Sequence, residues 1–169
     1  MTEKEKFSFN TINQIGIVVK DLDKTMEAYW KQFGIGPWRI YHLGPGMKDM
    51  TYHGKPCSFS LKVGVTRIGG LAIELIQPLS GPTPLKDFME EHGEGMQHVG
   101  IVVENLEKAI GEMKQRGYEV IMSARGLGTK GDGGSAYFNT GQSLGTLVEF
   151  IEMPEEMQPP QRIYPELKE

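Results

Sequence analysis

The chain has 169 residues, 38% of them hydrophobic and 24% charged, which indicates one folded domain or two small modules sharing a core. Its net charge of −4, with both signs scattered along the chain, argues against nucleic acid as a partner. No apolar run is long enough to cross a bilayer, the first residues lack a signal-peptide pattern, and the single cysteine, Cys57, excludes a disulfide framework, so a cytoplasmic location is expected.

The first half of the chain predicts a strand, a helix and then three further strands. Residues 12–19 are rich in isoleucine and valine, as is typical of a buried strand. Asp21 is placed to cap a helix whose apolar residues recur at helical spacing as far as Phe33. The other strands are expected at 38–43, 58–66 and 71–77, with a loop at 44–55 and a tight turn at 67–70.

The second half predicts the same order of elements. Asn105 is placed to cap a helix that closes near Gly117, and a short helix is expected within the linking segment, at 84–89. Strands are expected at 98–103, 118–122, 135–139 and 145–152. The predicted divisions are an N-terminal tail at 1–11, a first module at 12–80, a linker at 81–95, a second module at 96–153 and a C-terminal surface tail at 154–169.

Two pairs of segments show that the halves are copies of one unit. QIGIVVKDLDK at 14–24 and HVGIVVENLEK at 98–108 share six of eleven residues at a constant offset of 84, and LAIELI at 71–76 echoes TLVEFI at 146–151. One such unit would leave a sheet edge and a sheet face uncovered, so two units are expected to complete each other. The predicted fold is α+β, with two βαβββ modules in tandem forming a curved mixed sheet around a metal-binding cavity.

Each copy carries one polar residue near its start and one near its end, in strands that are otherwise apolar. These four residues are Gln14, Glu74, His98 and Glu149. A buried amide or carboxylate needs a hydrogen-bond partner or a ligand, and the duplication is expected to bring the four together. One imidazole and three oxygen donors suit Zn²⁺, Co²⁺, Ni²⁺, Mn²⁺ or Fe²⁺ in an open octahedral shell. The alternative is a polar core held by hydrogen bonds alone.

The chain resembles the vicinal-oxygen-chelate superfamily (the glyoxalase, bleomycin-resistance and dioxygenase proteins) over roughly residues 12–153. Within it, the stretch from Ile73 to Leu79 and the run from Gly93 to Val99 are most similar to methylmalonyl-CoA epimerases. The resemblance implies paired βαβββ modules with ligands on the first and last strand of each, and a homodimer. The ligand set of glutamine, glutamate, histidine and glutamate is similar to that of glyoxalase I enzymes of the eukaryotic type. The epimerases carry a glutamate in the third strand, whereas residues 57–63 contain none.

This resemblance implies a metal-dependent isomerase that removes a proton next to a carbonyl group. Glu149 and Glu74 are the expected catalytic bases, one for each face of the substrate carbon. The substrate is expected to be a small carbonyl compound, either an acyl-CoA thioester or an α-chiral ketone such as an isoflavanone. Its expected contacts are Trp38, Tyr41, Tyr52 and Lys62.

Three other functions remain open on the same resemblance. The first is a glyoxalase I-type lactoylglutathione lyase, which uses a related ligand set. The second is an extradiol dioxygenase, which needs two histidines and one carboxylate on Fe²⁺; Gln14 occupies one of those histidine positions. The third is a ligand-sequestering protein of the bleomycin-resistance kind, which uses the cavity without a metal.

Overall fold

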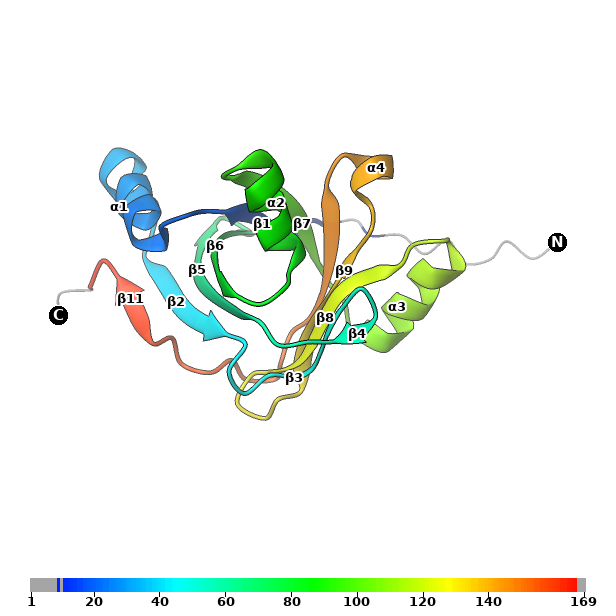
Figure 1. Cartoon of the computed structure of the whole chain (residues 1–169). Coiled ribbons are helices and arrows are strands. Elements are labelled where there is room, and N and C mark those ends of the chain that lie inside the picture. The colour runs from blue at the N-terminus through cyan, green and yellow to red at the C-terminus, as the bar shows by residue number, and fades with distance from the viewer. Residues whose placement is uncertain (1–8, 10, 167–169) are drawn as a thin grey trace.

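All the strands of the described chain lie in one curved sheet (Figure 1). The structure, a computed structural model, describes residue 9 and residues 11–166, so most of the predicted N-terminal tail lies outside the described residues. The first half contains β1 (Gln14–Val18), α1 (Leu22–Phe33), β2 (Trp38–Leu43), β3 (Lys48–Tyr52), β4 (Lys55–Pro56), β5 (Ser60–Ile68) and β6 (Leu71–Ser80). The rest contains α2 (Pro84–His92), β7 (Gly95–Val102), α3 (Leu106–Gln115), β8 (Val120–Leu127), β9 (Gly133–Phe138), α4 (Gly141–Leu144), β10 (Leu147–Glu152) and β11 (Arg162–Tyr164).

The two halves meet where their first strands pair. The strand order is β11-β2-β5-β6-β1-β7-β10-β9-β8-β3-β4. β1 is parallel to β6 and antiparallel to β7, and β7 is parallel to β10, so each half places its last strand beside its first. The sheet bends into two arms with a concave face between them (Figure 1). This architecture confirms the predicted α+β class and the curved mixed sheet built from two repeats.

The two long helices cover the convex face and start at equivalent points of the repeat. Asp21 and Asn105 cap them by accepting hydrogen bonds from the backbone amides three residues ahead. The last strand of each half adds a second contact: Gln77 Oε1 accepts from the amide of the first residue of α1, and Glu152 Oε2 does the same for α3, both at 3.0 Å. Each helix buries its apolar side against its own half of the sheet. The cluster beneath α1 includes Trp38, and the equivalent cluster beneath α3 includes Phe138.

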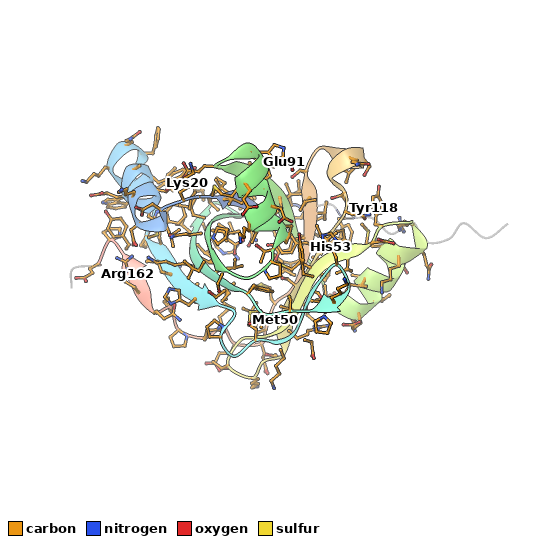
Figure 2. All side chains as sticks on the ribbon, in the orientation of Figure 1. Lys20, Met50, His53, Glu91, Tyr118 and Arg162 are labelled. Atoms are coloured by element: carbon orange, nitrogen blue, oxygen red, sulfur yellow. The ribbon has the colours of Figure 1, made fainter. Side chains whose placement is uncertain are left out.

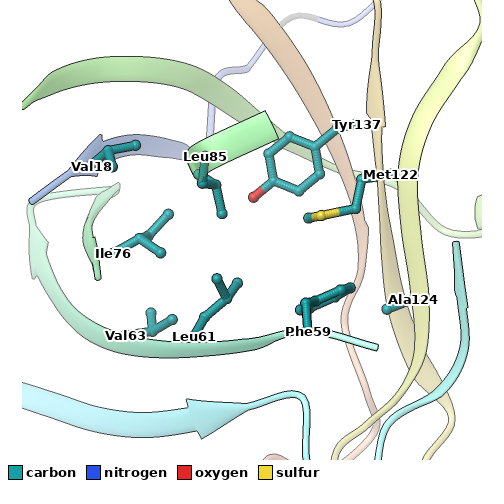
Figure 3. Packing of buried hydrophobic residues seen from close by; sticks show 9 residues of the cluster. All are labelled: Val18, Phe59, Leu61, Val63, Ile76, Leu85, Met122, Ala124 and Tyr137. Atoms are coloured by element: carbon teal, nitrogen blue, oxygen red, sulfur yellow. The ribbon is translucent and has the colours of Figure 1, made fainter. Parts of the chain in front are cut away.

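The concave face is filled at one end by an apolar cluster that includes α2. Leu85 of α2 is fully buried and points toward Leu61 and Ile76 from the first arm, while Tyr137 and Met122 approach from the second arm (Figure 3). Side chains therefore occupy the space between the arms at this end (Figure 2). The helix expected within the linker thus closes one end of the sheet's hollow.

Replacing Leu85 by alanine is expected to destabilise the protein by about 2–5 kcal/mol, because the packed cluster cannot collapse onto the space left behind. Chemical denaturation measures the change. Leu144→Ala is the matched control, since the Leu144 side chain is 58% exposed and should change the free energy of unfolding by less than about 0.5 kcal/mol. Equal effects at the two positions would contradict the assigned packing role of α2.

The segment expected to be a loop at 44–55 instead crosses to the other half. Its strand β3 pairs with the second-half strand β8, the Thr51 and Ser123 hydroxyls lie 2.8 Å apart, and β4 turns back on β3. This strand was missed because its apolar alternation is limited to Met50 and Tyr52, too short to stand out in a segment that also contains Gly44, Pro45, Gly46 and Gly54. Its partner also lies far away in the sequence. The hairpin extends the edge of the second arm.

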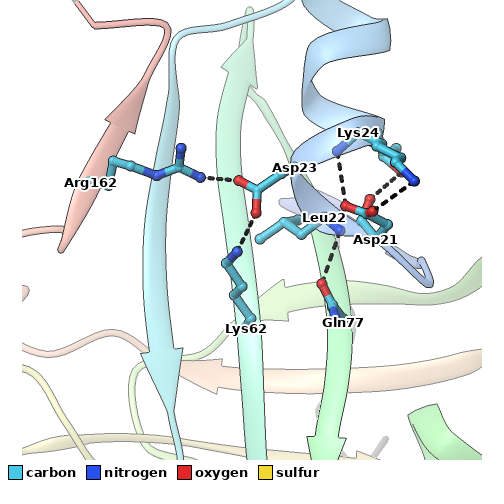
Figure 4. Close-up of polar contacts among 8 residues, drawn as sticks. Asp21, Leu22, Asp23, Lys24, Lys62, Gln77 and Arg162 are labelled. Atoms are coloured by element: carbon cyan, nitrogen blue, oxygen red, sulfur yellow. Dashed lines mark hydrogen bonds and ion pairs between the residues drawn. The ribbon is translucent and has the colours of Figure 1, made fainter.

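The predicted surface tail after β10 also forms part of the sheet. It runs from the second half to the first, where β11 pairs antiparallel with β2 and Asp23 of α1 binds both Arg162 and Lys62 (Figure 4). Along the way, Gln158 Oε1 accepts a hydrogen bond of 2.7 Å from the amide of Gly128. The C-terminal segment therefore connects the loop between β8 and β9 to the outer edge of the first arm at β2. No helix among the described residues is long and apolar enough to span a membrane.

Candidate functional site

Four polar side chains meet on the concave face where the two halves join. Successive residues of a strand face opposite sides. Glu74 of β6 and Glu149 of β10 therefore face inward, while their neighbours Ile73, Leu75, Val148 and Phe150 belong to the clusters beneath α1 and α3. The register places Glu74 beside Gly16 and Glu149 beside Gly100. The residues that the sequence analysis singled out as ligands therefore come together: Gln14, Glu74, His98 and Glu149.

The contacts among these four groups converge on the two carboxylates. Gln14 Nε2 donates to Glu74 Oε2 at 2.9 Å and to Glu149 Oε2 at 3.1 Å. His98 Nε2 lies 3.6 Å from Glu74 Oε2 and 3.3 Å from Glu149 Oε2. The amide and the imidazole thus each face both carboxylates, one from either side of the pseudo-twofold.

His98 is held with one ring nitrogen directed at the carboxylates. Its Nδ1 lies 2.7 Å from Oε1 of the buried Gln97, whose own Nε2 donates to the carbonyl of Pro84. That contact favours a proton on Nδ1 and leaves the lone pair of the neutral ring on Nε2. The edge of the Tyr137 ring packs against the imidazole at a centroid distance of 4.9 Å. The ring is therefore fixed in orientation, and in its neutral form the Gln97 contact also selects the tautomer.

These residues fit a divalent cation. His98 Nε2 is fully buried and has no hydrogen-bond partner among the described residues, although it faces two carboxylates. Donor atoms of Glu74, His98 and Glu149 all lie within 4.8 Å of one another. Imidazole nitrogen with carboxylate oxygen is a donor set that first-row divalent metals favour. Gln14 would join this set through Oε1, which a half-turn of its amide brings to the position now taken by Nε2.

Burial shifts the acid–base properties of the cluster. Removal from water raises the pKa of Glu74; the neighbouring His98 imidazole opposes this shift and the charge of Glu149 adds to it. Burial alone would lower the pKa of His98, but Glu149 and Glu74 outweigh it and raise the pKa to about 9. Burial, followed by the charges of the same two glutamates, raises the pKa of the Tyr137 hydroxyl well above its ordinary value. The metal-free cluster thus favours a protonated imidazolium beside its carboxylates.

Gln14 and His98 each rest on a glycine of the other half. Gly16 of β1 is paired in register with His98, and Gly100 of β7 is paired with Gln14. A Cβ at Gly16 would lie 1.9 Å from His98 Cε1, and a Cβ at Gly100 would lie 2.8 Å from Gln14 Cβ. The glycine two residues after Gln14 therefore makes room for His98, and the glycine two residues after His98 makes room for Gln14.

The cluster opens into a cavity of about 250 Å³ at the end of the concave face opposite α2. Gln14, Glu74 and Glu149 line it, together with Tyr41 from β2. The C-terminal segment contributes Met153 and Met157, and two arginines also line the cavity: Arg39 and Arg67. The cavity is mostly apolar, with charged groups at defined places on its wall.

The expected substrate contacts do not all face this cavity. Tyr41 does. Trp38 is fully buried under α1, where its indole nitrogen donates to the carbonyl of Ile35. The Tyr52 hydroxyl donates to Asp87 of α2, and Lys62 pairs with Asp23 on the convex side. Alternation within the strands already carried this signal, since Trp38 and Tyr41 are three residues apart and must face opposite sides.

Sequence reasoning missed three residues that the structure places at the site. Gln97 was hidden because it lies next to His98 and reads as a second polar residue of the same strand. Tyr137 reads as an ordinary core aromatic. Arg67 stands at the start of the predicted turn after β5, and only the curvature of the sheet shows that it faces the cavity.

Comparison with known proteins gives a consistent picture. Residues 13–138 match the family profile described as Glyoxalase/Bleomycin resistance protein/Dioxygenase superfamily. The mitochondrial methylmalonyl-CoA epimerase of Bos taurus is 23% identical over 126 residues, which are 74% of this chain and 65% of that protein, so the chain spans less than two thirds of this relative's length.

Two solved structures share the fold. The methylmalonyl-CoA epimerase of Mycobacterium tuberculosis superposes with a TM-score of 0.61 at 19% identity, covering 85% of this chain and 87% of that one. A hypothetical protein from Bacillus halodurans C-125 superposes with a TM-score of 0.59 at 28% identity, covering 88% and 97% of the two chains. The chain therefore shares its fold, in which the polar cluster lies between the two repeats, with a methylmalonyl-CoA epimerase.

Proposed function

The chain belongs to the Glyoxalase/Bleomycin resistance protein/Dioxygenase superfamily, and from that premise we propose that it is a divalent-metal-dependent epimerase or racemase acting next to a carbonyl group. The observation that carries this proposal is the pair Glu74 and Glu149. The two carboxylates come from equivalent strands of the two halves, are largely buried, and face one cavity. Inversion at a carbon needs a proton acceptor on one face and a donor on the other, and this pair supplies both.

The residues that would hold the cation are Gln14, Glu74, His98 and Glu149. A bound divalent ion would act as a Lewis acid toward the substrate carbonyl. One carboxylate accepts the α-proton, the electrons of the C–H bond pass to the carbonyl oxygen, and the carboxyl group on the other face returns a proton to the same carbon. General base catalysis of this kind contributes about 10²–10⁴-fold. The buried setting excludes water that would otherwise compete for that carbon.

The substrate we propose is an acyl-CoA thioester or an α-chiral ketone. The names of the epimerase relatives support the thioester, and the apolar part of the cavity wall supports a compact hydrophobic body around the carbonyl. One observation favours a second candidate, a glyoxalase I-type lyase: an amide, Gln14, stands opposite His98 in the ligand set. Both reactions begin with removal of a proton next to a carbonyl.

The wild-type protein is expected to contain about one divalent ion per chain and to exchange the α-proton of its substrate with solvent. Elemental analysis measures the first. Proton NMR in deuterated buffer measures the second, across methylmalonyl-CoA, an isoflavanone, and methylglyoxal with glutathione. Chelation should abolish exchange, and re-addition of Zn²⁺, Co²⁺, Ni²⁺ or Mn²⁺ should restore it. Ligand binding without metal and without exchange on any compound would instead support a sequestering protein.

A further inference from the structure

Two arginines line the cavity and are its only arginines. Arg39 of β2 and Arg67 of β5 both face the concave side and are both exposed toward the cavity. Neither forms an ion pair with any residue that the structure describes. The other three arginines of the protein form ion pairs: Arg116 with Glu112, Arg125 with Glu107 and Glu152, and Arg162 with Asp23. Within the described residues, the cavity therefore contains two guanidinium groups that no carboxylate contacts directly.

Each arginine stands in the same cross-strand row as one of the ligand residues. Arg39 pairs with Val65, which pairs with Glu74. In the next inward-facing row, Arg67 pairs with Ala72, which pairs with Gln14. Adjacent strands lie about 4.8 Å apart, so in each row the Cα atoms of the arginine and the ligand residue are about 10 Å apart. A small molecule is long enough to contact both residues of a row across the one apolar side chain between them, which is Val65 in the first row and Ala72 in the second.

The opposite arm has no such charge. Glu149 pairs across the sheet with Tyr137, and Tyr137 pairs with Met122, so the corresponding row of the second half is apolar. From that half the cavity wall also includes Val102, Leu127, Gly134, Ser135 and Ile151, none of which is charged. The two halves thus present nearly equivalent glutamates but chemically different walls.

We propose that Arg39 and Arg67 bind a carboxylate carried by the substrate itself and thereby fix which way round the substrate lies between Glu74 and Glu149. This inference rests on the proposed function, because it assumes that the substrate carbonyl sits at the polar cluster. Guanidinium groups match the planar geometry of a carboxylate and form its strongest protein contacts. Without such an anchor, the pseudo-twofold site would accept a small ketone in either direction.

The test compares an acidic ketone with its neutral ester. The metal-loaded protein is titrated with 4-methyl-5-oxohexanoate and with its methyl ester, and exchange of the proton on the methyl-bearing carbon is followed in deuterated buffer. The acid is expected to bind about 10–100-fold more tightly than the ester, as expected for hydrogen bonds to a charged group. Arg39→Met and Arg67→Met should each weaken the preference for the acid, and the double variant should remove it.

Controls separate this inference from the proposed function. Lys55→Met removes an exposed cation of β4 outside the cavity and should leave the preference unchanged. The double variant should still exchange the α-proton of the ester. The exchange rates of the two ester enantiomers should differ less in this variant than the rates of the two acid enantiomers differ in the wild type. Equal affinity of the wild type for acid and ester, or no binding of either, would overturn the arginine site. Selective binding of the acid without exchange of any probe would retain the arginine site and reject the proposed function.

Discussion

Glu149→Gln is expected to abolish the interconversion of substrate enantiomers while leaving the fold and most of the bound metal in place. Glutamine has the same shape and keeps an oxygen donor, but it cannot accept the α-proton. The interconversion rate should fall by about 10²–10⁴-fold. Because Glu74 serves the other face, exchange with deuterated solvent should be lost for one enantiomer and kept for the other.

Glu74→Gln is the complementary variant, because it removes the base on the opposite face of the substrate carbon. That variant should also stop interconversion but should lose exchange for the opposite enantiomer. Both proteins are assayed with excess divalent metal, and elemental analysis confirms occupancy, so weaker binding of the ion is separated from loss of the base. Glu104→Gln, an exposed site in the turn after β7, is the charge-matched control. Undiminished exchange of both enantiomers by Glu149→Gln would remove this residue from the reaction.

Gly16→Ala is expected to destroy the site and to destabilise the protein by about 3 kcal/mol. The added methyl group would lie 1.9 Å from Cε1, 2.2 Å from Nε2 and 2.4 Å from Nδ1 of His98. The ring has no free space to move into, because Gln97 holds one side and Tyr137 packs against it. Overpacking of a fixed core position costs about 1–3 kcal/mol. The free energy of unfolding, the metal content and the exchange rate should therefore all decrease in this variant.

A double variant shows whether the clash with the imidazole is the cause. Gly16→Ala combined with His98→Ala should recover most of the stability relative to Gly16→Ala alone but none of the activity, since the methyl group then occupies the space of the ring. Gly111→Ala in α3, where nothing lies within 4 Å of the added carbon, is the control and should be neutral or stabilising. Normal stability and metal content in Gly16→Ala would contradict the reciprocal packing.

The internal repeat made the centre of the fold predictable. Once Gln14 and His98 were recognised as equivalent residues, the pairing of β1 with β7 followed, and a polar residue in each final strand had to face the same hollow. The capping residues Asp21 and Asn105 located both long helices. These predictions depended on short-range sequence patterns and on the internal repeat, and both can be recognised from the amino-acid sequence alone.

The outer parts of the sheet were not predictable in the same way. β3 and β11 each pair with a strand of the other half of the chain, and both are too short to show the extended apolar alternation that marks a strand. Their conformation is set by a partner that exists only after the arms have folded. The cavity wall depends on those additions too, since Met157 reaches it only because the C-terminal segment returns to β2.

The reciprocal glycine contacts across β1 and β7 have a consequence for the origin of the site. An assembly of two identical half-length chains must place the same side chain at both related positions, because its symmetry axis permits no difference. Joining the halves in one polypeptide removes that restriction. An amide can then stand where its twin has an imidazole, and one arm can become cationic while the other stays neutral, so a single preferred direction of binding for a small ligand becomes available only after fusion.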